Sequence, residues 1–191
     1  MGILLFNTFW MIYNLYLAVL PVIFCWFLFK MPHKIYTIIV VFLWFLYLPN
    51  TIYVFSDLHH LVEQWSMFNL AGKVVLLYQY AILEIIGLTC FLVAFYPFEK
   101  ILNTYKITGN KATIILIALN FLMGFAVVLG KFERVNSWDL FLNPIFVITS
   151  TLHTLFSYQM FGLIILFGLF ANFFYFLFRG QAKKLYTRWS T

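Results

Sequence analysis

Long apolar stretches alternate with short polar ones along this whole sequence. A helix needs about 20 apolar residues to cross the hydrocarbon core of a bilayer, which is roughly 30 Å thick. Five stretches reach that length and predict membrane-spanning helices over residues 3–29, 35–55, 73–97, 112–130 and 157–178. The fold class expected from this pattern is all-α, a polytopic bundle of transmembrane helices that forms a single domain over residues 1–191.

A sixth apolar stretch, residues 141–155, is only 15 residues long. It contains Asn143, Pro144 and His153, which are costly at the lipid-facing surface of a span. A re-entrant or interfacial segment suits it better than a full span. Five spans plus this segment is therefore the preferred topology, with six spans as the alternative.

The distribution of basic residues favours five spans, because cytoplasmic loops carry an excess of Lys and Arg. Five spans place the N-terminus outside and the C-terminus in the cytoplasm of a multi-pass cell-membrane protein. The inner side then carries nine basic residues and the outer side three; the three are Lys73, Lys131 and Arg134. A sixth span would move the four basic residues of the tail outside and leave five inside against seven outside.

Composition agrees with a bilayer as the solvent. Of 191 residues, 64% are hydrophobic and only 9% are charged, against roughly 25% charged in a soluble domain. The net charge of +6 comes from basic residues in short loops between apolar runs, the pattern of topology signals rather than of a nucleic-acid-binding face. The expected partner is the lipid bilayer, and no nucleic acid is expected.

A first polar constellation follows Pro49 at the end of the second predicted span. On a helix, Asn50, Tyr53, Asp57 and His60 share an arc of about 80°. Asp57 and His60 could aim a carboxylate and an imidazole at one metal ion, contact a solute, or act structurally as a helix cap and an interfacial histidine. His59 is expected to point about 100° away from His60.

A second constellation, residues 130–144, carries Arg134, Asn136 and Asp139 in one outer loop. Asn136 or Ser137 could be the N-cap of a short helix, and the whole segment could be an ordinary capped loop. Alternatively, the Arg134 guanidinium could bind a carboxylate or phosphate group, or pair with Asp57. Both constellations and the start of the His153 segment fall on the outer side, so we expect them to converge on an outward-facing polar cavity.

Isolated polar residues within the spans are expected to face protein. Asn7 and Asn14 are seven residues apart and lie on one side of the first helix. Glu84 lies in the middle of the third span. It predicts either an interhelical hydrogen bond or a proton or cation site, with Gln79 and Tyr80 as candidate neighbours.

These motifs resemble those of a known family. PNTIYVFSDLHHL resembles its PN-x-x-Y-x-x-x-D-x-x-H-L signature, and GKFERVNSWDLFLNP resembles its G-x-x-x-R-x-NSWD-x-x-x-x-P signature. The family is the bacterial integral-membrane family catalogued as domain of unknown function 1361, and the resemblance covers most of the chain. It implies a polytopic membrane protein and supplies no activity. The chain departs from the family pattern at Ile52, where a second proline is expected.

Three functions remain open from the sequence. The chain could bind or transport a small polar or ionic solute, with Asp57, His60, Arg134 and Asp139 at the mouth of the site. It could be a membrane enzyme acting on an envelope or lipid-linked substrate. It could also be a structural subunit bound to a membrane protein partner. The sequence contains none of the familiar nucleophile, metalloprotease or phosphate-loop motifs and identifies no cofactor.

Overall fold

The computed structural model describes residues 2–30, 34–136 and 138–190, and every element in this part of the chain is a helix. Five segments are long and apolar enough to cross a membrane: Gly2–Leu28, Thr37–Met67, Leu70–Thr104, Gly109–Lys131 and Tyr158–Leu185. They confirm the prediction of an all-α protein with five spans. The segment around His153 is a shorter apolar helix, Pro144–Phe156, and its re-entrant or interfacial placement stays a prediction.

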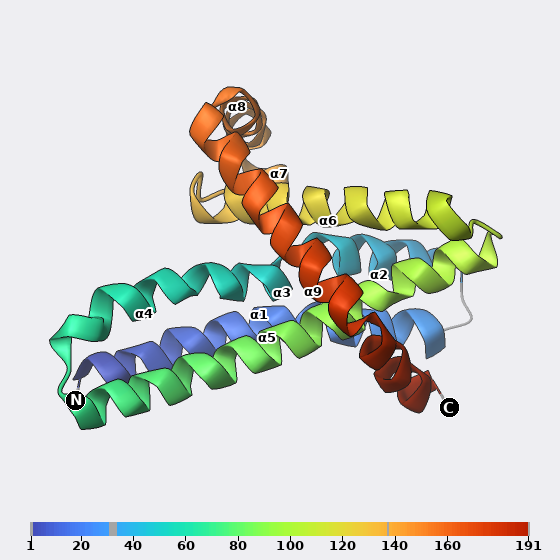
Figure 1. The fold of residues 1–191 in the computed structure, drawn as a ribbon. Helices are drawn as coiled ribbons and strands as arrows, with labels where there is room; N and C mark the ends of the chain where they lie inside the picture. The colour runs from blue at the N-terminus through green and yellow to red at the C-terminus, as the bar shows by residue number, and fades with distance from the viewer. Residues whose placement is uncertain (1, 31–33, 137, 191) are drawn as a thin grey trace. The chain divides into compact units, whose positions relative to one another are not determined.

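The helices form two compact units, Met1–Phe91 and Leu92–Thr191, and each is described by itself. The first unit runs from blue to green in Figure 1. It contains α1 (Gly2–Lys30), α2 (Lys34–Tyr47), α3 (Asn50–Tyr53), the 3-10 helix η1 (Val54–Asp57), α4 (Leu58–Gln64), the 3-10 helix η2 (Trp65–Met67) and most of α5 (Leu70–Thr104). The second contains the end of α5, then α6 (Gly109–Lys131), α7 (Asp139–Leu142), α8 (Pro144–Phe156) and α9 (Tyr158–Ser190).

The second span is interrupted between α2 and α3, as the proline predicts. Pro49 has no N–H to donate and disfavours a helical conformation in the residue before it. Two side chains satisfy backbone carbonyls at the interruption: Asn50 Nδ2 donates to the Tyr47 carbonyl (3.0 Å), and Thr51 Oγ1 donates to the Leu48 carbonyl (2.8 Å). The Leu48 carbonyl also accepts from the Thr51 backbone N–H at 3.1 Å. Unpaired carbonyls are costly in a membrane, so these bonds stabilise the break that leads into the first constellation.

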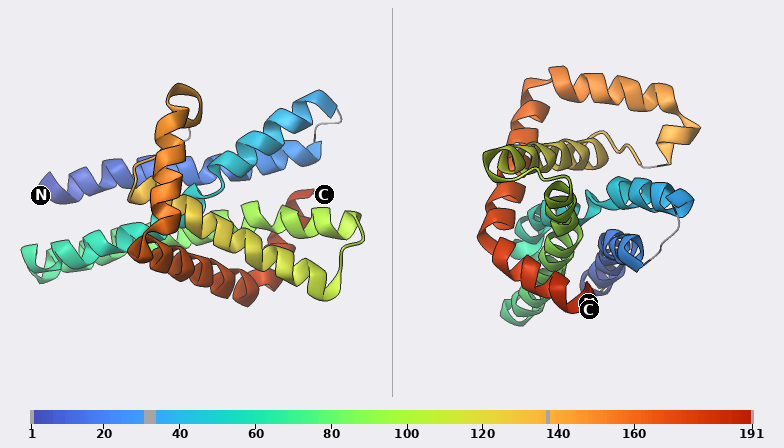
Figure 2. Two further views of the ribbon diagram at one scale, coloured as in Figure 1. Left: turned by 90° about the horizontal axis from the view of Figure 1, so that it is seen from above. Right: turned by 90° about the vertical axis from the view of Figure 1, so that its right-hand side faces the viewer.

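In the second unit, α6 and α9 lie against each other (Figure 2). Their crossing uses an Asn and a Gly four residues apart on each helix. Asn120 Nδ2 donates to Asn172 Oδ1 at 3.0 Å. Near this bond, a Cβ on Gly124 would lie 2.7 Å from the backbone nitrogen of Gly168 and 2.8 Å from the carbonyl oxygen of Ile164. Small residues let the two backbones approach closely, as is common between membrane helices.

Candidate functional site

The Asp57 carboxylate lies between two helical segments of the first unit. Asp57 ends η1 and is only 2% exposed. Its Oδ2 accepts a hydrogen bond of 2.7 Å from Asn14 Nδ2 on α1. A hydrogen bond to an ionised carboxylate is roughly twice as strong as one between neutral groups. The prediction that Asn14 faces protein is therefore confirmed, and the bond ties the first constellation to the first span.

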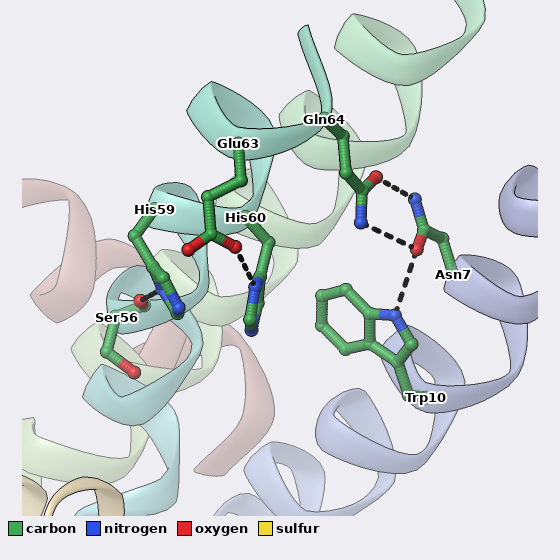
Figure 3. Close-up of polar contacts among 7 residues, drawn as sticks. All are labelled: Asn7, Trp10, Ser56, His59, His60, Glu63 and Gln64. Carbon is green, nitrogen blue, oxygen red and sulfur yellow. Dashed lines mark hydrogen bonds and ion pairs between the residues drawn. The ribbon is translucent and has the colours of Figure 1, made fainter. Parts of the chain in front are cut away.

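A second polar contact joins α1 to α4. Asn7 Nδ2 donates to Gln64 Oε1 at 2.6 Å, and Gln64 Nε2 donates back to Asn7 Oδ1 at 3.3 Å. The indole Nε1 of Trp10 also donates to Asn7 Oδ1, at 3.1 Å. Figure 3 shows these three side chains meeting between the two helices. Asn7 is fully buried, so its amide faces protein as predicted, and the two contacts make α1 the common partner of η1 and α4.

The first half of α5 adds a phenol and a carboxyl group to this unit. Asp57 lies within electrostatic range of both Tyr80 and Glu84. Both carboxyl oxygens of Glu84 and the hydroxyl of Tyr80 are buried, and none has a hydrogen-bond partner among the described residues. Gln79, one turn earlier, uses its Nε2 to bond the Leu4 carbonyl on α1 (2.9 Å). Among the residues that the structure describes, no interhelical hydrogen bond accounts for Glu84.

The two adjacent histidines of α4 lie together with Glu63. The ring centroids of His59 and His60 are 3.7 Å apart, although their positions on the helix differ by about 100°. His60 Nδ1 lies 3.0 Å from Glu63 Oε2, and His59 Nδ1 lies 2.7 Å from the Ser56 carbonyl oxygen. Figure 3 shows the two rings side by side beneath the carboxylate. His59, His60 and Glu63 form a three-residue group of potential metal ligands, and Asp57 is not a member of it.

The second constellation folds mainly on itself. Arg134 is exposed and has a left-handed backbone, with φ of 55°. Its carbonyl accepts from Asn136 Nδ2 at 3.3 Å, and the Asn136 backbone N–H donates to Asp139 Oδ2 at 2.7 Å. The predicted cap at Asn136 is wrong, because the helix begins at Asp139 after Trp138, and the Asp139 carboxylate closes the turn instead. Ser137 lies outside the described residues.

His153 of α8 is paired within the second unit. Its Nδ1 lies 2.7 Å from Glu133 Oε1, in the loop that follows α6. Asn143 caps α8 by accepting from the Phe146 backbone N–H at 3.3 Å, and Pro144 occupies the first helical turn, where it is tolerated. This contact links the loop of the second constellation to the His153 helix.

The structure also contains a polar contact that the sequence analysis missed. The Arg179 guanidinium on α9 donates two hydrogen bonds to Glu99 at the end of α5, both 2.7 Å. Tyr175 adds a third bond to the same carboxylate, at 2.9 Å. From the sequence, Arg179 is one of the four basic residues of the tail, and Glu99 has no predicted role. The sequence does contain a signal for this contact. Glu99 is an isolated carboxylate, and it and Arg179 lie at the predicted cytoplasmic ends of two spans.

The predicted site residues are divided between the two units. Asn50, Tyr53, Asp57, His60 and Glu84 belong to the first. Arg134, Asn136, Asp139 and His153 belong to the second. Asp57 and Glu84 lie close enough to interact, whereas Asn50 bonds its own helix break. The convergence of the two constellations and the pairing of Arg134 with Asp57 stay predictions.

The helices and their buried polar groups define a class of protein, a multi-pass, all-α membrane protein with polar side chains inside its spans. A family model described as "Protein of unknown function (DUF1361)" matches residues 13–174. The chain belongs to this family, because the match covers most of its length. No curated protein and no solved structure matches it significantly.

Proposed function

We propose that this protein binds or transports a small polar or ionic solute, and that Glu84, Tyr80 and Asp57 form its site. The observation that supports the proposal is the Glu84 carboxyl group. Both of its oxygens are buried in a candidate span, with no hydrogen-bond partner among the described residues. An unpaired polar group is expensive in such a place. A proton, a cation or a cationic group of a solute would remove that cost.

The neighbours of Glu84 narrow the class of ligand. Asp57 is a second carboxylate within electrostatic range, and Tyr80 presents a buried hydroxyl without a partner in the described part of the chain. Two carboxylates and a phenol supply oxygen atoms and negative charge, which favour a proton, a monovalent cation or an ammonium group over an anion. We assign the binding of any anionic group to Arg134 instead, because its guanidinium is positively charged and the residue is exposed.

The proposal includes an orientation in the cell membrane. The count of basic residues places the N-terminus and the Asp57 end of the second span outside. A membrane-impermeant thiol reagent should therefore label Ser66→Cys in intact cells, because Ser66 is exposed between α4 and α5. Lys106→Cys, between α5 and α6, should be labelled only after permeabilisation. The reverse pattern would overturn the orientation.

The test of binding is a thermal-shift screen of the detergent-purified protein. Alkali cations, small amines and polar solutes, each over a range of pH, form the panel. At least one should raise the unfolding temperature in a saturable manner, and Glu84→Gln should abolish that rise. Glu133→Gln is the matched control, since it changes a carboxylate of the second unit. A panel without saturable stabilisation, or equal stabilisation of Glu84→Gln, would overturn the proposal.

A structural or assembly role is the second candidate, and a specific observation favours it. Two polar residues of the second span, Asp57 and Gln64, make hydrogen bonds to α1 at 2.7 and 2.6 Å. This alternative requires no ligand and predicts that removing the Asp57 charge impairs folding or retention of a membrane partner. The stability of Asp57→Asn separates the two candidates, because an amide at this position can still accept the bond from Asn14.

A further inference from the structure

We propose that His59, His60 and Glu63 form a binding site for a divalent transition-metal ion of the zinc class. This site is distinct from the Glu84 site and goes beyond the function proposed above. Each of the three side chains offers one ligand atom, and these atoms lie within 4.8 Å of one another. Ligand atoms at 2.0–2.2 Å from a tetrahedral metal are about 3.3–3.6 Å apart. Small side-chain rotations would therefore close the group around an ion.

The hydrogen bond of His59 leaves one of its nitrogens available to a metal. A carbonyl oxygen only accepts, so the 2.7 Å contact with Ser56 places the proton of a neutral His59 ring on Nδ1. The lone pair then lies on Nε2. Histidines that bind metals almost always donate their other N–H to a carbonyl or carboxylate in this way, which fixes the tautomer and the orientation of the ring.

His60 is oriented by two neighbours. Its Nδ1 lies 3.0 Å from Glu63 Oε2, and the indole of Trp10 meets the ring edge-on with centroids 5.8 Å apart. The 3.0 Å between Nδ1 and Oε2 is close to the separation of two ligand atoms on one ion, so a neutral ring with its proton on Nε2 would present Nδ1 to the metal beside the carboxylate. Glu63 would then bind the ion through the oxygen that faces His60 Nδ1.

The close approach of the two rings also favours a metal. The ring centroids are 3.7 Å apart, so one ion can reach both rings. One ion bound to both neutral rings would hold them together as a chelate. Two nitrogens and one carboxylate oxygen suit Zn²⁺, Cu²⁺ or Ni²⁺ better than Mg²⁺ or Ca²⁺, which prefer oxygen ligands. His59 is exposed and the Glu63 side chain is 63% exposed, so an ion could enter from the surface.

The site lies on one short helix, which sets its expected strength. All three ligands come from the seven residues of α4, and Trp10 is the contact from another helix that restrains them. Three protein ligands would leave the fourth position of a tetrahedral ion for water or a further ligand. We therefore expect exchangeable binding rather than a metal that is required for folding.

The test is a titration of the full-length, detergent-purified protein with Zn²⁺, followed by calorimetry. The same titration with Co²⁺, followed by its absorption spectrum, reports the coordination geometry. We expect one ion per chain and at least about a tenfold loss of affinity in His59→Ala and in His60→Ala. His153→Ala is the matched control, because this histidine also contacts a carboxylate (2.7 Å) but is outside the three-residue group. Its affinity should equal that of the wild type.

Two further measurements distinguish the loss of a metal ligand from a failure of the variant to fold. Pulsed electron paramagnetic resonance of the Cu²⁺-loaded wild type should count two bound imidazoles, without depending on the folding of any variant. Asp57→Asn should bind Zn²⁺ as tightly as the wild type does. Any of four results would overturn the site. These are no saturable binding, a single bound imidazole, unchanged affinity in His59→Ala, or a loss of affinity in Asp57→Asn equal to that in His60→Ala. None of these outcomes bears on the Glu84 proposal.

Discussion

Asn14 Nδ2 donates to Asp57 Oδ2 at 2.7 Å, and this bond joins α1 to the break in the second span. The carboxylate is 2% exposed, so its acceptor needs cannot be met by bulk water. The same residue lies within electrostatic range of Glu84. Asp57 therefore has a structural partner on one helix and a candidate functional neighbour on another.

Asn14→Leu should destabilise the protein, because it removes the donor and leaves a buried carboxylate. The expected loss in the free energy of unfolding is about 1–3 kcal/mol. Asp57→Asn should cost much less, since its amide oxygen can accept the same bond. Reversible unfolding in mixed micelles measures both. A large loss in Asp57→Asn together with unchanged solute binding would favour the assembly role over the solute site.

The Asn7–Gln64 amide pair should behave as a coupled unit. Each single change to Leu removes both reciprocal bonds, so the double variant should lose much less stability than the sum of the two singles. The expected coupling is on the order of 0.5–1.5 kcal/mol. A double-mutant cycle measures it, with the exposed Gln159→Leu as the control for amide loss. Strictly additive effects would show that the pair contributes nothing to stability.

Gly124→Ala should separate α6 from α9. The added Cβ would meet backbone atoms of Gly168 and Ile164 at 2.7 and 2.8 Å, and backbone cannot rotate away as a side chain can. A loss of about 1–3 kcal/mol is typical of such overpacking. Gly162→Ala is the control, because its Cβ would meet nothing within 4 Å. The crossing would be disproved if the two variants unfolded at the same temperature.

The Glu99–Arg179 pair should depend on guanidinium geometry rather than on charge alone. Arg179→Lys keeps the charge but cannot make the two parallel bonds of 2.7 Å. Because Arg179 is 44% exposed, solvent screening limits the expected loss to roughly 1 kcal/mol. Arg179→Gln should cost more than Arg179→Lys, and high salt should reduce the difference. Equal stability of wild type and both variants would mean that the pair is not formed.

The sequence predicted the features that depend on periodicity and on the chemistry of single residues. The five spans follow from the length of the apolar stretches. The protein-facing side chains of Asn7 and Asn14 follow from the cost of exposing amides to lipid. Trp44, in the middle of the second span, is only 1% exposed and lies inside the protein.

Features that depend on tertiary packing or side-chain torsions could not be predicted in this way. Helical geometry separates His59 from His60 by about 100° at the backbone, yet their side chains bring the rings together. Glu99 and Arg179 are 80 residues apart, and no local pattern pairs them. Nor does any spacing show that Asp57 would find its donor on the first span.

Infrared difference spectroscopy of the purified protein tests the Glu84 site most directly. The spectrum is recorded before and after addition of the solute or cation that gives the largest thermal shift. We predict a change in carboxyl absorption that disappears in Glu84→Gln and persists in Glu133→Gln, because the bound ligand would contact the Glu84 carboxyl group directly. Saturable binding without any carboxyl change, or with a change that survives in Glu84→Gln, would contradict the account.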